Sequence, residues 1–418
     1  MGPATLDVRP RQVVVAGGGP AGATAATLLA QQGVDVLLVE KEEMPRFHIG
    51  ESLMTETWWP LERLGLVDWL RQSSFPRKYS VQFISDTGKP SRPFYFFETN
   101  SHESAVTWQV ERSIFDAKLV ERARECGVEV HTSTSVERVV FDGDRATGVV
   151  VRRDDETLEI PSTVFVDATG LGAVLARQLR LIQKDPKLRK AAIFAHYRGA
   201  LRDEGIDEGA TLIISTTENR GWFWYIPLAD DRVSVGVVGS PDDLLKARGS
   251  PEEVLAEEVA ACATMAERLA RAELASPVRV VADFSYRARR CSGDGWVLVG
   301  DAFGFIDPVY STGVFLALKS GQMAADSTAA ALRDGETTGG RLGSFAREFA
   351  AGMEAMRKLV HAFYTPGFSF ANFVRQHPEH RDRLVDLLIG NVFKPGVTDI
   401  FEDMKSFCDL PEEFPLEA

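Results

Sequence analysis

Cysteine is scarce in this chain of 418 residues, and long apolar segments are missing. The four cysteines are scattered and form no Cys-x-x-Cys pair, so we expect no disulfide framework, no bound metal and a reducing, cytoplasmic environment. They are Cys126, Cys262, Cys291 and Cys408. Residues 1–11 are too short and too polar for a secretory signal, and no stretch approaches the ~20 apolar residues of a membrane helix. We therefore expect a soluble protein with no stable membrane insertion.

Basic clusters and low-complexity linkers are also missing. The chain has 47 Lys and Arg against 60 Asp and Glu, which gives a net charge of −13. Because no basic block offsets this charge, a nucleic-acid partner is not expected. The length and the ordinary hydrophobic content predict a folded protein of two closely linked domains.

A βαβ unit is predicted at the start of the chain. Residues 13–16 form an apolar run typical of a buried parallel strand, residues 20–32 are rich in alanine and leucine, and residues 35–40 predict a second strand. Between the first strand and the helix, residues 17–22 fit the pattern G-x-G-x-x-G. This combination is typical of a dinucleotide-binding turn.

Each glycine of that turn has a separate role. Gly17 permits the tight turn, Gly19 lets the backbone approach a pyrophosphate, and Gly22 lets the helix pack closely on the strand. The helix start then offers N–H groups to the phosphates. Glu40, at the end of the second strand, suits a ribose diol and would repel a 2′-phosphate, so FAD and NAD both remain possible.

The remaining pattern is mixed. Hairpins are predicted at residues 78–108, a helix at 113–126, and strands at 128–140, 146–153, 163–167 and 297–299. Four alternating segments, at 191–198, 210–216, 221–227 and 232–238, predict an antiparallel sheet. Helices are predicted from the capping box at Ser250 to about Ala272, over 313–332, and over most of 341–418.

Three further segments resemble the glutathione-reductase-type flavoproteins. Gly300-Asp301 follows a predicted strand and resembles their second FAD signature, in which the aspartate binds the ribityl chain. Arg112 matches the arginine that this family places against FAD, and residues 164–170 match its middle strand motif. Together these matches favour FAD over NAD.

Three motifs resemble the flavin-dependent halogenases over nearly the whole chain. They are Pro45–Leu53, the segment Trp222-Phe223-Trp224-Tyr225-Ile226-Pro227, and the loop at residues 305–314 that contains Asp307-Pro308 and Ser311-Thr312-Gly313. The resemblance implies that backbone N–H groups of Thr312 and Gly313 bind the halide. It also implies that the segment with Trp222, Trp224 and Pro227 keeps the substrate away from the flavin, although a spacing of two equally suits ordinary core packing of one strand face.

Lys78 stands where this family carries its catalytic lysine. The amine would capture hypohalous acid, either as a chloramine or by hydrogen bonding as an ammonium, and burial would favour the neutral amine. We expect the neighbouring Arg77 to be dispensable. The flavin contacts implied by the resemblance are Gly17, Gly19, Pro20, Ala21, Gly22, Glu40, Lys41, Arg112, Asp301, Pro308, Gly313 and Val314.

The resemblance implies a halogenase of natural-product biosynthesis that uses FADH₂, O₂ and chloride or bromide, with a separate flavin reductase as partner. Tyr310 replaces the glutamate that the free-tryptophan halogenases carry before Ser311, and the chain is shorter than those enzymes. Both departures resemble the subgroup acting on phenols or pyrroles, often tethered to an acyl or peptidyl carrier protein. Five aromatic residues between positions 363 and 373 could line or cover the substrate site, or simply pack between helices.

Three alternatives remain open: an FAD-dependent aromatic hydroxylase of the same fold, a flavoprotein resembling the geranylgeranyl reductases, which reduce prenyl chains, and a degenerate flavoprotein that acts only as a binding partner. In each case the expected fold is α/β of the glutathione-reductase type, similar to the aromatic hydroxylases. The expected FAD-binding domain comprises residues 1–80, 105–180 and 278–335. An antiparallel-sheet substrate domain comprises 81–104 and 181–277, and 336–418 form a helical C-terminal region.

Overall fold

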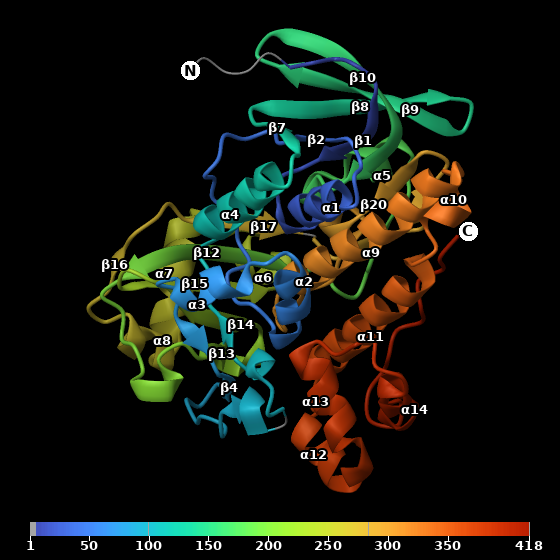
Figure 1. The fold of residues 1–418 in the computed structure, drawn as a ribbon. Coiled ribbons are helices and arrows are strands. Elements are labelled where there is room, and N and C mark those ends of the chain that lie inside the picture. The colour runs from blue at the N-terminus through green and yellow to red at the C-terminus, as the bar shows by residue number, and fades with distance from the viewer. Residues whose placement is uncertain (1–5, 99, 283, 418) are drawn as a thin grey trace.

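Two large sheets and a group of C-terminal helices make up the protein. The computed structural model describes residues 6–98, 100–282 and 284–417. In Figure 1 the sheet that contains β1 (Arg11–Ala16) lies above the sheet that contains β14 (Trp222–Pro227), and the C-terminal helices, orange to red, lie along one side. In the described part of the chain, no helix has the length and apolarity needed to cross a bilayer.

Parallel strands form the centre of the first sheet. β2 (Val36–Val39) pairs with one side of β1, and the end of β10 (Glu156–Asp167) pairs with the other. β7 (Glu129–His131) extends the sheet beside β2, and β20 (Trp296–Leu298) extends it beside β10. The predicted βαβ unit is thus confirmed, and its short apolar strands are buried as expected for a parallel sheet.

One helix packs on β1 and β2 of this sheet, and two others lie against that helix. α1 (Pro20–Gln31) contacts both α4 (Arg112–Glu125) and α9 (Thr312–Asp334). The approach of α9 to α1 is close, since a Cβ added at Gly321 would lie 2.4 Å from the carbonyl oxygen of Ala21. The predicted helices at 20–32, 113–126 and 313–332 are therefore confirmed to within two residues.

The predicted single strand at 128–140 is wrong. It is divided into β7 and β8 (Thr134–Asp142), with Ser133 in the left-handed region at φ 51°. The break exists because the two halves have different partners: β7 joins the parallel sheet, whereas β8 pairs antiparallel with β9 (Arg145–Arg153), which pairs with the first half of β10.

The second sheet contains the predicted antiparallel strands in the order β12-β15-β14-β13. They are β12 (Ala191–Arg198), β13 (Thr211–Ser215), β14 and β15 (Arg232–Gly239). The predicted hairpin region contributes β4 (Ser80–Ile84) and β5 (Phe94–Tyr95), but β4 pairs parallel with β13, so the sheet is mixed. β16 (Glu273–Leu274) and β17 (Arg279–Ala282) pair with β12.

The predicted capping box at Ser250 is present, but the helix that it starts is shorter than expected. α7 (Pro251–Ala261) and α8 (Ala263–Arg268) are separated by Cys262, whose backbone is extended. The hydroxyl of Thr217 donates to the carbonyl oxygen of Ala261, so this carbonyl is satisfied where the helix ends.

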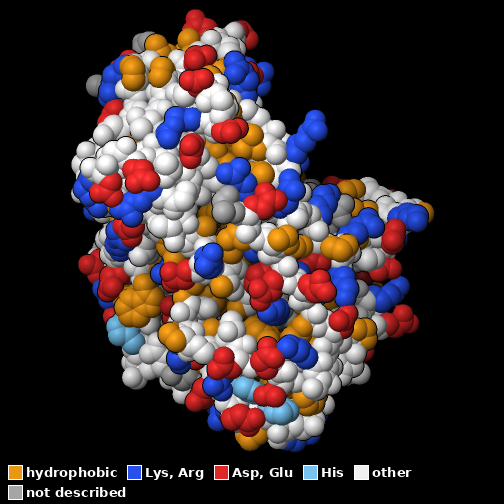
Figure 2. Space-filling view, turned by 90° about the vertical axis from the view of Figure 1, so that its right-hand side faces the viewer, with side chains coloured by type: hydrophobic (Ala, Val, Ile, Leu, Met, Phe, Trp, Pro, Cys, Tyr) orange, Lys and Arg blue, Asp and Glu red, His pale blue; other side chains and the backbone are white. Residues whose placement is uncertain are grey.

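The C-terminal region is mostly helical, as predicted. Its helices are α10 (Gly339–Leu342), α11 (Ala346–Tyr364), α12 (Phe370–Gln376), α13 (Arg381–Ile389) and α14 (Ile400–Met404). The acidic tail packs back on the body, since Arg287 donates to the carbonyl oxygens of Phe414 and Pro415. On the face shown in Figure 2, positive and negative side chains are intermixed with hydrophobic ones.

Shorter elements complete the fold. They are α2 (Trp58–Arg63), α3 (Val67–Gln72), α5 (Val174–Gln178), α6 (Pro241–Leu244), β3 (Arg77–Lys78), β6 (Thr107–Trp108), β11 (Ile182–Lys184), β18 (Tyr286–Ala288), β19 (Ser292–Gly293) and β21 (Gly304–Phe305). β3 and β6 form a separate two-stranded sheet.

Candidate functional site

A cavity of about 380 Å³ lies at the carboxyl ends of three parallel strands of the first sheet. Gly17 follows β1, Thr169 follows β10, and Asp301 follows β20. In α/β sheets this edge is where ligands bind. The second sheet supplies the opposite wall, so the cavity lies between the two sheets.

The glycine turn is built for close approach. A Cβ on Gly17, whose φ is 107°, would lie 2.2 Å from the carbonyl oxygen of Ala168, and one on Gly22 would lie 2.0 Å from that of Gly17. Gly19 precedes the first residue of α1 and offers no side chain to cap it. Gly17 and Gly19 line the cavity, whereas Gly22 lies behind the turn and serves packing.

Glu40 lines the cavity and also holds the turn. Its carboxylate accepts hydrogen bonds from the backbone N–H of Gly18 at 2.7 Å and of Glu42 at 3.0 Å, and Arg46 Nε lies 3.7 Å away. Lys41 beside it lines the same cavity but is exposed, with an ion-pair distance of 3.5 Å to Glu42. Pro20 and Ala21 line it from α1.

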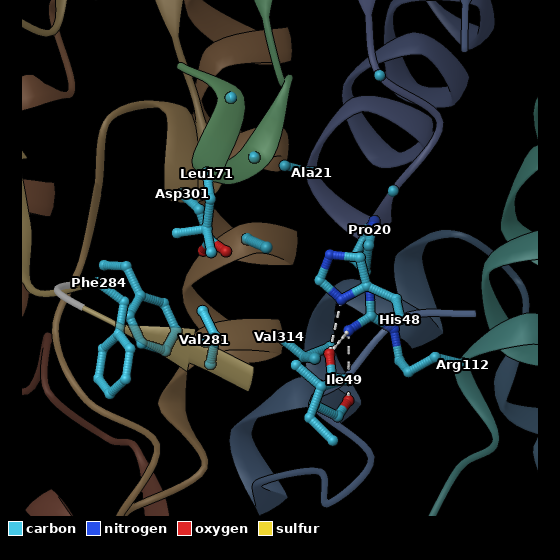
Figure 3. A pocket seen from close by; sticks show the side chains of 18 of the residues that line it. Pro20, Ala21, His48, Ile49, Arg112, Leu171, Val281, Phe284, Asp301 and Val314 are labelled. Atoms are coloured by element: carbon cyan, nitrogen blue, oxygen red, sulfur yellow. Dashed lines mark hydrogen bonds between the residues drawn. The ribbon is translucent and has the colours of Figure 1, made fainter. Parts of the chain in front are cut away.

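Arg112 is fixed on one side of the cavity. Its guanidinium forms two hydrogen bonds to Asp116, at 2.8 and 2.9 Å, and one to the carbonyl oxygen of Ile49 at 2.6 Å. His48 lies beside it and shares the Ile49 carbonyl (Figure 3). Burial, with the charge of Arg112, lowers the pKa of His48 to about 4, so this imidazole is neutral at pH 7.

Asp301 lies on the opposite side in Figure 3. Burial raises the pKa of its carboxyl to about 6, against the opposing effect of Arg112. The N–H of the preceding Gly300 donates to Ser320 Oγ on α9, which fixes the backbone at the strand end. A desolvated carboxyl that faces a cavity is suited to accept hydrogen bonds from a bound polyol.

The predicted halide loop leads into the start of α9. Pro308, Ser311, Gly313 and Val314 line the cavity, whereas Thr312 does not. Ser311 has a left-handed backbone with φ 58°, and α9 begins at the next residue. The loop therefore places the N-terminus of a 23-residue helix beside the cavity, where a partial positive charge favours an anion.

The two tryptophans of β14 form part of the cavity wall. Trp222, Trp224 and Ile226 share one face of the strand and line the cavity, whereas Pro227 does not. The indole centroids of the two tryptophans lie 6.2 Å apart. Gly236 on the neighbouring strand makes room, since a Cβ there would lie 2.2 Å from the Trp224 ring.

A buried hydrogen-bond network joins this wall to the halide loop. Trp222 Nε1 donates to the hydroxyl of Tyr364 at 2.9 Å, and that hydroxyl donates to the Asp307 carboxyl at 3.1 Å. Burial raises the pKa of Asp307 to about 7 despite hydrogen bonds from the Val309 N–H and Tyr364 and the charge of Lys190. The C-terminal helix α11 thus contacts both parts of the predicted site.

Lys78 is buried on β3 but does not line the cavity. Its amine donates to Ser52 Oγ at 2.8 Å and to the carbonyl oxygen of Leu53 at 3.0 Å, and it lies 5.5 Å from the ring centroid of Phe96. Burial lowers the pKa of this amine to about 7, so the neutral form is accessible near neutrality. The neighbouring Arg77 is exposed.

Several cavity residues were not assigned from the sequence. Ser52 and Glu51 belong to the recognised Pro45–Leu53 segment, but their contacts with distant strands could not be predicted. Glu51 accepts from His196 of β12 at 2.6 Å, and Ser52 Oγ lies 2.9 Å from Thr211 Oγ1 of β13. The other unassigned lining residues include Arg46, His48, Phe194, Ile213, Val281, Phe284 and Phe305.

Phe363 and Tyr364, the first two of the five aromatic residues at positions 363–373, lie behind the tryptophan wall of the cavity. Phe363 packs edge-on against Trp222 with centroids 6.5 Å apart and contacts the ring of Tyr310 at 6.0 Å. Phe368 and Phe373 pack against each other with centroids 6.4 Å apart. Among the described residues that line the cavity, none comes from this segment.

One group of potential metal ligands lies outside the cavity. His377, Glu379, His380 and Asp403 place one ligand atom each within 4.8 Å of one another. His380 Nε2 lies 2.7 Å from Asp403, while its Nδ1 faces the guanidinium of Arg383 at 3.3 Å. Because a guanidinium only donates, Nδ1 is the acceptor and Nε2 carries the proton, which explains the pairing without a metal.

Comparisons with known proteins agree with the motifs. Residues 12–104 and 86–369 match the family described as tryptophan halogenase. A 1H-pyrrole-2-carbonyl-[peptidyl-carrier protein] brominase of Pseudoalteromonas luteoviolacea is 33% identical, over 91% of this chain and 92% of the relative. The corresponding chlorinase of Pseudomonas fluorescens is 28% identical, over 96% and 94%.

Solved structures give the same result. The flavin-dependent brominase Bmp2 matches with a TM-score of 0.85 and 31% identity, over 95% of this chain and 98% of that chain. The myxobacterial chondrochloren halogenase CndH, a variant of FAD-dependent halogenases, matches with a TM-score of 0.81 and 28% identity, over 98% and 99%. The predicted glutathione-reductase-type α/β fold is thereby confirmed, and the chain is an FAD-dependent enzyme that belongs to the flavin-dependent halogenase family.

Proposed function

We propose that this enzyme uses FADH₂, O₂ and chloride or bromide to halogenate an electron-rich aromatic ring, a pyrrole or phenol, held on an acyl or peptidyl carrier protein. Two relatives that match more than nine-tenths of the chain act on a pyrrole-2-carbonyl group carried by a peptidyl carrier protein, which supports this substrate class. The observation that carries the chemistry is the buried Lys78 amine, whose pKa burial lowers to about 7. A neutral amine would capture hypohalous acid as a chloramine, and an ammonium would hold it by a hydrogen bond.

The cavity residues fit a bound FAD. The glycine turn, whose Gly17 and Gly19 line the cavity, suits the pyrophosphate, Glu40 the ribose and Asp301 the ribityl chain. Arg112 is held by Asp116 and lines the same cavity. When bound and reduced, the flavin supplies the reaction of O₂ that converts halide to hypohalous acid.

The chain's own residues would provide anion binding and separation. The backbone N–H groups of Thr312 and Gly313 at the start of α9 would bind the halide, since a helix N-terminus favours an anion. Trp222 and Trp224 would keep the aromatic substrate away from the flavin, since their adjacent rings form part of the cavity wall. Lys78, buried beyond the cavity lining, would then deliver the halogen to the ring.

Two partners complete the proposal. A separate flavin reductase would supply FADH₂, and the carrier protein would present the substrate.

The test is an aerobic reaction with FAD, a flavin reductase, NADH and either halide, followed by mass spectrometry. Pyrroles and phenols are offered both free and attached to a carrier protein.

A halogen isotope pattern in a carrier-bound ring is the expected result. Lys78→Met should abolish it, whereas Arg77→Ala, which alters an exposed neighbour, should retain it. Addition of one oxygen, independent of halide, would instead identify an aromatic hydroxylase. Halogenation of free substrates alone would refute the carrier-protein part of the proposal.

A further inference from the structure

Two hydroxyl groups connect Lys78 with the cavity. Ser52 Oγ accepts from Lys78 Nζ at 2.8 Å and lies 2.9 Å from Thr211 Oγ1, so the three groups form a continuous hydrogen-bonded chain. Ser52 and Thr211 both line the cavity, although Lys78 does not. All three residues are buried, with exposed fractions of 4%, 2% and 2% for Ser52, Thr211 and Lys78. The hydroxyls therefore stand between the amine and the cavity.

Gln109 limits how the hydrogens of this chain can be arranged. Its Nε2 donates to Thr211 Oγ1 at 2.8 Å and to the carbonyl oxygen of Gly209 at 2.8 Å. Since the Gly209 carbonyl can only accept, the amide nitrogen must lie on this side. Thr211 consequently already accepts one hydrogen from Gln109.

Counting hydrogens gives one direction of the chain for the Lys78 ammonium and two for the neutral amine. An ammonium donates to Ser52, so one hydroxyl hydrogen lies between Ser52 and Thr211 and the other is left to point into the cavity. A neutral amine keeps two hydrogens, enough to donate to Ser52 Oγ and to the Leu53 carbonyl. Its lone pair can instead accept from Ser52, which then accepts from Thr211 and leaves no hydroxyl hydrogen for the cavity. Only the neutral amine can accept from Ser52, so loss of the Lys78 proton is what allows the direction of the hydrogen-bonded chain to reverse.

We propose that Ser52 and Thr211 are a proton relay between the amine of Lys78 and the flavin cavity, an inference that rests on the proposed halogenase function. A proton leaves Lys78 for Ser52 Oγ, the Ser52 hydroxyl proton moves to Thr211 Oγ1, and the Thr211 proton passes to a hypohalite ion or a water molecule in the cavity. Three O–H or N–H bonds break and three form, so both hydroxyls are restored and one proton has moved. The reverse sequence returns a proton to the amine.

The neighbouring charges leave this relay intact. Glu51, adjacent to Ser52, is paired with His196 at 2.6 Å, and Arg232 lies against Glu111 rather than in the relay. Burial is the cause of the altered pKa of Lys78. The relay therefore links a titratable amine to the cavity through two groups that are themselves neutral at working pH.

Thr211 allows a matched test. Thr211→Val keeps the shape but removes the hydroxyl, whereas Thr211→Ser keeps the hydroxyl and removes the methyl group. With carrier-bound substrate, we expect Thr211→Val to lower halogenated product per reduced flavin by about 10²-fold, as for loss of a proton-transfer group. Thr211→Ser should stay within about threefold of the wild type, because serine retains the hydroxyl that transfers the proton. Equal losses in both variants, or no loss in Thr211→Val, would overturn the relay.

A second measurement needs neither flavin nor turnover. The pKa of Lys78 is read in the purified protein by NMR of lysine labelled with ¹³C at Cε, with its signal assigned from its absence in Lys78→Met. Ser52→Ala removes an acceptor of the ammonium, and hydrogen bonds to a charged donor are the stronger ones, so the pKa should fall further. An unchanged pKa would refute the link between Ser52 and Lys78. If wild-type enzyme makes no halogenated product, the proposed function fails, while this titration still decides whether Lys78 and Ser52 are coupled.

Discussion

Tyr364→Phe tests whether the end of α11 holds the tryptophan wall and the halide loop together. The substitution removes one oxygen atom and keeps the ring. That oxygen accepts from Trp222 Nε1 at 2.9 Å and donates to Asp307 at 3.1 and 3.3 Å. Both partners are buried, so neither can turn to bulk water when the hydroxyl is lost.

The expected cost follows from these two contacts. A buried indole N–H without a partner costs about 1–3 kcal/mol, and loss of a hydrogen bond to the Asp307 carboxyl costs about 1–2 kcal/mol more. The total loss of unfolding free energy is therefore about 2–5 kcal/mol. The loss should lie below about 5 kcal/mol, because Asp307 can stay protonated and neutral when the tyrosine hydroxyl is removed. Burial already raises the pKa of this carboxyl to about 7.

Urea unfolding at pH 7 measures this loss, and Tyr95→Phe is the matched control. The hydroxyl of Tyr95 also donates to a carboxylate, that of Asp207 at 3.0 Å, but at the surface, where water replaces it. We expect a much smaller effect there. The same Tyr364→Phe protein should give less halogenated product per O₂ consumed, because wall and loop are no longer tied. Equal destabilisation by the two substitutions would refute the reasoning.

Three further predictions concern residues around the same cavity. In the wild type, the free energy of unfolding should fall between about pH 4 and 7, because the folded protein keeps the Asp307 proton up to about pH 7 whereas the unfolded chain loses it near 3.8. The difference amounts to about 4 kcal/mol. Asp307→Asn should abolish this fall when both proteins are unfolded over a series of pH values. The free energy of unfolding of the wild type should rise between about pH 7 and 10.5, since the unfolded chain binds a proton on Lys78 there that the folded one does not. Lys78→Met should remove this rise. Equal slopes of unfolding free energy against pH in the two proteins would show that the amine is solvated. Gly236→Ala places a Cβ 2.2 Å from the Trp224 ring, so it should lower the free energy of unfolding by about 1–3 kcal/mol and displace the ring. A lower Tm and altered tryptophan fluorescence would show this. Wild-type values of both would show that the ring has room.

Local patterns predicted the first sheet well because its elements depend on neighbours in sequence. The glycine turn, the strand before it and the helix after it all lie within residues 11–31, and the structure confirms them. The alternation of β14 likewise placed Trp222 and Trp224 on one face without knowledge of what the face contacts. Both inferences use only the repeat of a helix or strand.

Contacts between distant segments could not be predicted in this way. Ser52 meets Thr211 across 159 positions of sequence, and Trp222 meets Tyr364 across 142. No periodicity encodes such pairs, because they depend on how the two sheets and α11 are placed. The same reason explains the wrong strand at 128–140, where the chain changes sheet at Ser133.

The long-range contacts of Ser52 connect the buried amine of Lys78 with a cavity that Lys78 does not line. β3, which carries Lys78, pairs only with β6 among the described strands and belongs to neither large sheet. Ser52 contacts the amine from the segment after β2, and Thr211 of the second sheet contacts Ser52, so the two sides of the cavity are joined at Ser52 beside this amine. Lys78 lies on this small separate sheet and is connected to the cavity through Ser52 and Thr211. In the proposed function this position would keep the amine apart from the flavin and leave it a path for protons.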